Sequence, residues 1–265
     1  MSASEPSRPR SGRRSGPIIQ VIDLYKSFGD NQVLRGLNLE VEEGTTCVIL
    51  GASGSGKSVL LKHIIGLMHP DSGKVIVDGL EVSRLSSREL DTFRERFGMV
   101  FQFSALFDSM TIFENVAFPL IEHRKDLGRD DIEEIVSQKL QLVGLSGVEE
   151  KLPAELSGGM RKRVGLARAI AREPKILLYD EPTTGLDPIT TDSVNEMIEN
   201  MQERLGVTSV VISHDIASAF RIADQVAVLH QGRIVEKGSP EELRRTTHPH
   251  VLAFLRAWLG RPANE

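Results

Sequence analysis

The alternation of apolar and polar residues predicts strands in the first part of the chain. Residues 17–24 and 32–41 alternate as strands with one buried face do, and a Gly29-Asp30-Asn31 turn separates them. Residues 45–50 form an apolar run, which is typical of a strand buried on both faces. Residues 74–77 predict one more strand.

Strand patterns return in the second half of the chain, at residues 175–179, 208–212, 226–229 and 232–235. A predicted helix over residues 190–205 separates the first two of them. Strands that alternate with helices favour a parallel sheet with crossover helices. The predicted fold class is therefore α/β.

The middle of the chain, from about Gln102 to Arg172, is mainly helical in pattern. Thr111 is a candidate cap for one helix, Asp130 or Asp131 for a second, and Ser157 for a third. We therefore expect one domain over residues 18–245, with a helical subdomain at about 102–172.

The two ends of the chain differ from this domain. Residues 1–17 are rich in Ser, Pro and Arg, which predicts a disordered tail. Residues 246–265 predict a C-terminal helical extension, whose Pro249 suits a first helical turn. Its apolar residues fall on one stripe of a helix: Val251, Phe254, Leu255, Trp258 and Leu259. The stripe packs either on the chain's own core or on another subunit; our hypothesis is an intersubunit contact.

Composition narrows the class of protein. Of the 265 residues, 40% are apolar, enough for a sizeable core, and the net charge of −5 argues against a general nucleic-acid binder. There is no apolar run of the roughly 18–20 residues that a bilayer span needs, and the N-terminus lacks the apolar segment of a secretory signal. The one cysteine, Cys47, lies in an apolar run, which favours a buried structural thiol.

A glycine-rich loop carries the first chemical signal. Its sequence is Gly51-Ala52-Ser53-Gly54-Ser55-Gly56-Lys57-Ser58, between the predicted strand 45–50 and a helical stretch over residues 57–67. This is the P-loop pattern in its required context: glycines let backbone N–H groups point at phosphate oxygens, and the helix N-terminus favours anions. Lys57 would carry charge to the terminal phosphates, and Ser58 would offer its hydroxyl to Mg²⁺.

The predicted strand 175–179 is followed by two acidic residues of the kind that accompany a P-loop. Asp180 and Glu181 follow this apolar strand directly, which is how P-loop proteins approach the metal from the far side. Asp180 is expected to bind Mg²⁺ through water. Glu181 is expected to lie beside the terminal phosphate and polarise the attacking water.

Several motifs in a fixed order resemble the ABC ATPase family. Leu156-Ser157-Gly158-Gly159-Met160 resembles its signature, with Met160 where Gln is usual. The other matching positions are Phe28 for adenine stacking (Tyr25 is a nearby rival), Gln102 of the Q-loop, Gly185-Leu186-Asp187-Pro188 of the D-loop, and the switch histidine His214. The resemblance covers about residues 18–243, nearly the whole chain.

The resemblance implies a P-loop NTPase core, with a mixed sheet and an antiparallel β subdomain, plus the helical subdomain. It also implies ATP and Mg²⁺ bound in a homodimer whose two sites are each shared by both chains. In that arrangement Lys57, Gln102, Glu181 and His214 act in catalysis, and Ser58, Gln102 and Asp180 bind the metal. Nucleotide binding would add a larger set: Phe28, Gly51, Ser53, Gly54, Ser55, Gly56, and, from the signature and D-loop, Ser157, Gly158, Gly159 and Asp187.

The residues between the motifs resemble one branch of the family. The stretch from Phe101 to Leu120, Met160, and Asp187-Pro188-Ile189-Thr190 are similar to the ATPases of MCE-type (Mla) phospholipid transport systems of Gram-negative bacteria. That branch implies a location at the cytoplasmic face of the inner membrane. It also implies an integral membrane permease, an MCE protein and a STAS-domain regulator as partners, and no nucleic acid.

Other functions stay open at this point. Within transport, the chain could serve an amino-acid importer or a lipoprotein-releasing complex. A soluble ABC ATPase of DNA repair is disfavoured because there is no long heptad run, and one of translation because there is room for only one ATPase domain. A non-hydrolysing ATP-binding module is disfavoured by the presence of Glu181 and His214.

Overall fold

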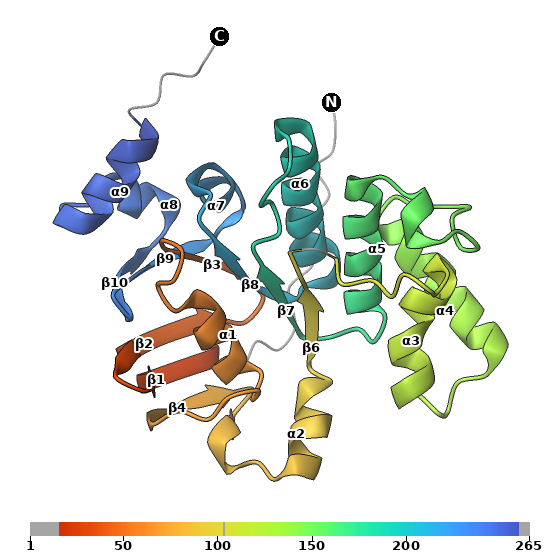
Figure 1. The fold of residues 1–265 in the computed structure, drawn as a ribbon, viewed down its shortest axis with the longest axis horizontal. Helices are drawn as coiled ribbons and strands as arrows, with labels where there is room; N and C mark the ends of the chain where they lie inside the picture. Colours follow the sequence, from red (N-terminus) through yellow and green to blue (C-terminus); the bar gives the residue numbers. More distant parts are fainter. Residues whose placement is uncertain (1–15, 103, 260–265) are drawn as a thin grey trace, which may run out of the picture.

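A six-stranded sheet forms the centre of the molecule (Figure 1). The computed structural model describes residues 16–102 and 104–259, so residues 1–15 of the predicted tail lie outside the described residues. The strands run parallel except for the edge strand β10. In spatial order they are β10 (Arg233–Gly238), β9 (Gln225–His230), β3 (Thr46–Leu50), β8 (Thr208–Ser213), β7 (Ile176–Asp180) and β6 (Phe97–Val100).

A second, four-stranded sheet is antiparallel and lies beside the first. Its spatial order is β2 (Asn31–Glu42), β1 (Pro17–Phe28), β4 (Ser72–Val77) and β5 (Leu80–Glu81). Strand β1 runs past the predicted end at residue 24, because Tyr25 to Phe28 continue the pairing with β2. The mixed sheet with an antiparallel second sheet confirms the predicted fold class.

The central sheet is buried on both faces, as its apolar runs predict. In β3, Val48 and Leu50 point into a core shared with the helices, whereas Cys47 and Ile49 point into a core shared with the antiparallel sheet. The same alternation continues through β7, β8 and β9. The sheet is therefore fixed from both sides, which gives the loops at its carboxyl edge a rigid base.

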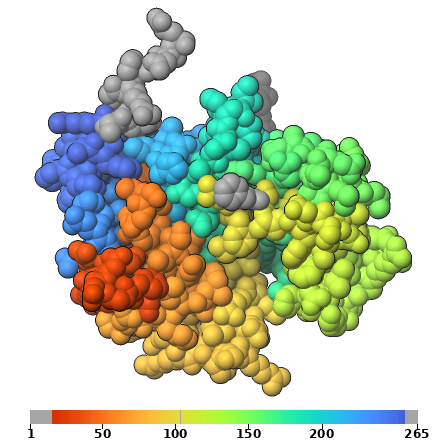
Figure 2. Space-filling model, viewed as in Figure 1, coloured from red at the N-terminus to blue at the C-terminus, as the bar shows by residue number. Residues whose placement is uncertain are grey.

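Helices cover the remaining surfaces. They are α1 (Lys57–Ile64), α2 (Ser87–Arg94), α3 (Ile112–His123), α4 (Arg129–Leu142), α5 (Gly158–Ile170), α6 (Pro188–Leu205), α7 (Ile216–Ile222), α8 (Pro240–Arg244) and α9 (Pro249–Leu259), with short 3-10 helices at Val82–Arg84 and Pro153–Glu155. Figure 2 shows α3 and α4 as a lobe at the right, away from the antiparallel strands. No helix in the described part of the chain is both long and apolar enough to cross a membrane.

Local capping chemistry explains where the central helices begin. Thr111 caps α3 in a reciprocal capping box with Glu114, and Ser157 caps α5, so both predicted starts are confirmed. The prediction for α4 was wrong: the cap is Gly128, not Asp130 or Asp131. The Asp131 carboxylate instead accepts the Gly128 N–H at 2.9 Å, so the acidic residue stabilises the first turn from inside the helix.

Other boundaries also differ from the sequence pattern. Helix α1 ends at Ile64, short of the predicted residue 67, because left-handed Gly66 terminates it. Helix α6 begins at Pro188 rather than residue 190, since the Asp187 side chain accepts the Thr190 N–H and caps it. Helix α2 was not predicted, although Ser86 and Glu89 form a complete capping box at its start.

Helix α9 packs on the chain's own core. Val251 and Leu255 of its apolar stripe are buried there, and Phe254 is partly buried against the same cluster. The side chains of Trp258 and Leu259 lie outside the described residues. The described part of the stripe thus has a partner within the chain, and Val251 and Leu255 are not free for an intersubunit contact.

The first turn of α9 meets the end of β9 through two histidines. The rings of His230 and His250 stack with centroids 3.4 Å apart and planes at 22°. Burial lowers the pKa of His250, and the neighbouring His230 and His248 lower it further. The folded chain therefore favours neutral His250, so this contact is fully stable above the unfolded pKa of about 6.5 and weakens as the pH falls below it.

We expect the wild-type melting temperature to fall more steeply than that of His250→Phe between about pH 7.5 and about pH 5.5. Phenylalanine keeps a stackable ring but cannot take up a proton. The expected difference is on the order of 2 °C, to be measured by thermal unfolding at each pH. The control is His123→Phe, which changes an exposed histidine of α3. Equal pH slopes for the wild type and His250→Phe would contradict the assignment.

Candidate functional site

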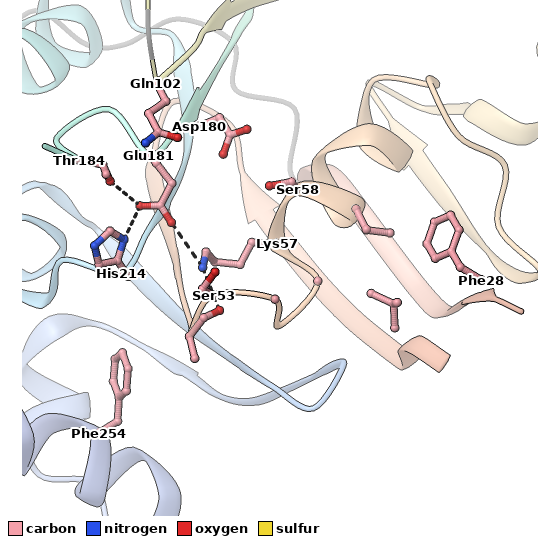
Figure 3. A pocket seen from close by; sticks show the side chains of 15 residues that line it. Phe28, Ser53, Lys57, Ser58, Gln102, Asp180, Glu181, Thr184, His214 and Phe254 are labelled. Carbon is pink, nitrogen blue, oxygen red and sulfur yellow. Dashed lines mark hydrogen bonds and ion pairs between the residues drawn. The ribbon is translucent and has the colours of Figure 1, made fainter. Parts of the chain in front are cut away.

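The glycine-rich loop joins the buried strand β3 to helix α1 at the carboxyl edge of the sheet (Figure 3). Two of its glycines are required by space. A Cβ on Gly51 would lie 2.6 Å from the Leu229 carbonyl oxygen, and one on Gly56 would lie 2.9 Å from a Leu34 methyl group. Gly56 also has a φ of 105°, which suits glycine and few other residues. The loop is thus held closely against β9 and β2.

Lys57 turns back across this loop. Its Nζ donates to the carbonyl oxygens of Gly51 at 2.7 Å and Ala52 at 3.1 Å, and only 6% of its side chain is exposed. The buried Ser55 hydroxyl has no hydrogen-bond partner among the described residues. A buried cation beside an unpaired hydroxyl and a helix N-terminus makes a site for anionic oxygens.

Glu181 links the loop to the neighbouring strands. One carboxylate oxygen lies 3.4 Å from Lys57 Nζ. The other accepts from His214 Nδ1 at 2.7 Å and from the Thr184 hydroxyl at 3.1 Å (Figure 3). Because an ionised carboxylate only accepts, this contact places a proton on Nδ1 of His214. The structure therefore brings Lys57, Glu181 and His214 together in one connected group.

Ser53 also lines this pocket, and so do three further side chains with oxygen atoms suited to a metal: Ser58, Gln102 and Asp180. Ser58 is exposed on the first turn of α1, and Asp180 ends β7. Burial raises the pKa of Asp180, and the adjacent Glu181 raises it further, whereas Lys57 and Lys62 lower it. Hydroxyl, amide and carboxylate oxygens are the ligands that Mg²⁺ prefers, so this donor set fits that ion.

The antiparallel sheet supplies the far wall of the pocket. Phe28, at the end of β1, is 48% exposed and lines it. Tyr25 points elsewhere, because its ring lies over Gly36, where an added Cβ would be 2.7 Å from the hydroxyl oxygen. The structure therefore favours Phe28 over Tyr25 as the aromatic side chain available to a ligand.

The signature and the D-loop residue do not line this pocket. Ser157 is the exposed cap of α5, and Gly158 and Gly159 form its first turn. Asp187 is the exposed cap of α6, and hydrogen bonds from the Thr190 side chain and backbone lower its pKa. These two helix starts are neighbours, since a Cβ on Gly159 would lie 3.4 Å from Thr190 Cγ2. One chain thus holds the two halves of the predicted site apart.

The pocket has a volume of about 860 Å³, within the range of small-molecule sites of about 300–1,000 Å³. Sequence reasoning missed four of the residues that line it: Val33, Val59, Thr184 and Phe254. Thr184 follows Glu181 by one turn, and a hydroxyl at that spacing carries no distinctive signal. Phe254 comes from α9, and only the tertiary fold brings it to the pocket (Figure 3).

The ABC transporter family model matches residues 34–184. The "Probable ribonucleotide transport ATP-binding protein mkl" of Mycobacterium leprae is 42% identical over 240 residues, which are 91% of this chain and 69% of that protein. The "Intermembrane phospholipid transport system ATP-binding protein MlaF" of Haemophilus influenzae is 41% identical over 239 residues, 90% of each chain. The "Methionine import ATP-binding protein MetN" of Carboxydothermus hydrogenoformans is 48% identical over 225 residues, 83% of this chain and 65% of that protein.

Solved structures agree with these relatives. The cbiO1 protein of Clostridium perfringens, described as part of an ABC transporter complex, superposes with a TM-score of 0.81 at 31% identity, covering 93% of this chain and 97% of that one. A dimeric ATP-binding cassette, MJ0796 bound to ADP and phosphate, superposes with a TM-score of 0.75 at 31% identity, covering 84% and 98%. With a P-loop, an acidic pair and a signature helix in one such fold, the chain belongs to the ABC transporter family, as a subunit that binds and hydrolyses ATP.

Proposed function

We propose that this subunit drives phospholipid transport between the inner and outer membranes of a Gram-negative bacterium, and so maintains the lipid asymmetry of the outer membrane. The observation that carries the proposal is the match to MlaF, which extends over 90% of both chains. The match to MetN is higher in identity but spans only 65% of that protein, which therefore has a part that this chain does not match. An amino-acid importer is the second candidate, on the strength of that identity, ahead of a lipoprotein-releasing complex.

The site residues divide into two groups in this proposal. The phosphates are held by the side chain of Lys57 and by the rest of the loop from Ser53 to Ser58. Phe28 stacks on adenine. Ser58, Gln102 and Asp180 would hold Mg²⁺, which would supply positive charge to stabilise the phosphates. The second chain of a homodimer supplies Ser157, Gly158, Gly159 and Asp187, because one chain keeps these residues outside the pocket.

Glu181 acts as the base in this proposal. Its carboxylate accepts a proton from the attacking water, and His214 orients that carboxylate through the 2.7 Å contact. Lys57 pairs with Glu181 at 3.4 Å, and the terminal phosphate competes with the carboxylate for this cation. Substrate binding would then release Glu181 toward the water. The protein thus works through position and charge, with little covalent chemistry.

We also propose how the chain is divided into domains and which partners it binds. Residues 18–245 form the ATPase domain, with a helical subdomain at about 102–172, and residues 246–265 form the C-terminal extension. The partners are an integral membrane permease (MlaE-like), an MCE protein (MlaD-like) and a STAS-domain regulator (MlaB-like). The subunit would lie peripherally on the cytoplasmic face of the inner membrane, and the permease would dock on the helical subdomain.

Purification of the tagged chain from solubilised membranes of its own host tests the cargo. We expect mass spectrometry to identify a permease, an MCE protein and a STAS-domain protein, together with glycerophospholipid above the level seen with an unrelated membrane complex. A matched strain carrying Lys57→Ala should accumulate phospholipid in the outer leaflet of its outer membrane. Loss of amino-acid uptake in that strain, with normal outer-membrane lipid, would instead support the importer.

A further inference from the structure

The backbone at Glu181 adopts an unusual conformation. Its φ is +51°, in the left-handed region that residues other than glycine rarely occupy. Such a conformation persists only where surrounding contacts hold it. The carboxylate position therefore depends on what fixes the peptide units on either side of Glu181.

Backbone bonds fix the residue itself. The Glu181 N–H donates to the Ile212 carbonyl at 3.0 Å, which continues the ladder between β7 and β8. The Glu181 carbonyl accepts from the Thr184 N–H at 3.3 Å, which closes the following turn. The next peptide unit is held differently: the Pro182 carbonyl accepts a hydrogen bond from the ammonium group of Lys162.

Lys162 lies in surroundings that give its charge little else to bind. Its side chain borders a small apolar cavity, together with Leu166, Tyr179, Pro182 and Val194. Burial lowers the pKa of Lys162, and no carboxylate in the described part of the chain forms an ion pair with it. A partly buried cation with a carbonyl as its acceptor is a costly arrangement, which suggests a role beyond surface charge.

The other basic side chains of α5 serve other segments. Arg161 donates to the Leu156 carbonyl, Arg163 to the Ser193 hydroxyl, and Arg168 to the carbonyls of Ser104 and Ala105. Of the described basic residues on α5, Lys162 is the one whose hydrogen bond reaches the turn after Glu181. The contact therefore links the signature helix to the base of the same chain.

We propose that Lys162 is a positioning residue for ATP hydrolysis, which holds the Pro182 carbonyl and thereby sets the left-handed backbone and the carboxylate of Glu181. The inference rests on the proposed role of Glu181 as the base. Because Lys162 lies on α5, two turns or less after Ser157, the setting of Glu181 depends on where this helix lies. Lys162 itself touches neither the nucleotide pocket nor its lining carboxylates.

Lys162→Met is the informative variant, because it keeps the length and the apolar stem but removes the donor. We expect kcat to fall by about tenfold or more, since misplacing a catalytic group by about 1 Å can cost about a hundredfold. The KM for ATP and the affinity for a fluorescent ATP analogue should change by less than about twofold, because the phosphate-binding loop is untouched. Lys162→Arg, which keeps a charged donor, should recover most of the wild-type kcat.

The matched control is Lys237→Met, which removes another lysine-to-carbonyl bond, to Glu40, on the opposite part of the fold. We expect Lys237→Met to keep the wild-type kcat. The inference would be overturned if Lys162→Met had the same kcat as this control, or if a raised KM were its only change. If circular dichroism shows that Lys162→Met does not fold, Lys162→Gln takes its place as the test variant. The glutamine amide is too short to reach the Pro182 carbonyl as the lysine does, so kcat should fall while KM stays unchanged. A wild-type kcat for that folded variant would equally overturn the inference.

Failure of the inference and failure of the proposed function are separable. If Glu181→Gln is inactive while Lys162→Met turns over normally, only the role of Lys162 is lost. If Glu181→Gln itself turns over normally, the base assignment is lost. In the double variant we expect no loss beyond that of Glu181→Gln alone, because a positioning residue acts through the group that it positions.

Discussion

Glu181→Gln is expected to bind ATP and to lower kcat by at least about a hundredfold, as loss of a general base does. The amide has the shape of the carboxylate but cannot take the proton from water. It also loses the ion pair with Lys57, which lies 3.4 Å away, so ATP meets less competition for this cation. Phosphate release measures turnover, and light scattering with ATP should show a long-lived dimer.

Glu203→Gln provides the control, since Glu203 is exposed on α6 and lines no part of the nucleotide pocket. It should keep wild-type turnover and show no ATP-dependent accumulation of dimer. Near-normal phosphate release from Glu181→Gln would remove the residue from its assigned role. Slow turnover without a dimer would be consistent with Glu181 as the general base, but it would contradict a nucleotide site shared by two chains.

Lys57→Ala is expected to weaken ATP binding by about tenfold or more, since a charge-assisted contact to phosphate contributes about 1.5–3 kcal/mol. The variant also leaves the carbonyls of Gly51 and Ala52 without their donor, so the loop should become less ordered. Titration with a fluorescent ATP analogue measures the affinity. Lys57→Arg should not restore it, because the guanidinium group is larger than the buried space around Lys57 Nζ.

Lys151→Ala serves as the control for Lys57→Ala, since Lys151 is exposed and far from the loop in sequence. Its ATP affinity should equal that of the wild type. Unchanged affinity in Lys57→Ala would show that the loop backbone alone binds the phosphates. A fall in melting temperature without a fall in affinity would assign Lys57 a structural role only.

The central sheet and the phosphate loop were readable from the sequence because both depend on local pattern. Strands 45–50 and 208–212 were predicted from apolar runs, and the structure places them as neighbours β3 and β8. The loop from Gly51 to Ser58 needs glycine at fixed points, where a side chain would collide with β9 or β2. Such requirements leave a signature in the sequence itself.

Helix starts were harder to predict where several residues could serve as the cap. Asp130 and Asp131 both suit a cap by type, yet Gly128 takes the position and Asp131 supports it from within the first turn. The choice depends on the path of the chain before the helix. For α2, the Ser86 and Glu89 pair was readable, but the helix is short and its apolar pattern weak.

Contacts between distant segments left no sequence signal. Thr184 and Phe254 line the pocket, and Lys162 reaches Pro182, only because the fold brings α5, α9 and the turn after β7 to the edge of one sheet. Their residue types are common, and their spacings match no motif. These contacts determine how the recognisable motifs are positioned, and the structure is needed to see them.

The burial of Cys47 makes the native chain suitable for spectroscopic labelling. It is the single cysteine of the sequence, it is 0% exposed, and burial raises its pKa to about 12. Thiol reagents attack the thiolate, so they should leave the folded wild type unmodified. One cysteine introduced at an exposed site, such as Ile189 at 83% exposure beside Asp187, would carry the only label. The distance between two such spin labels could then follow opening and closing of a pair of chains during turnover.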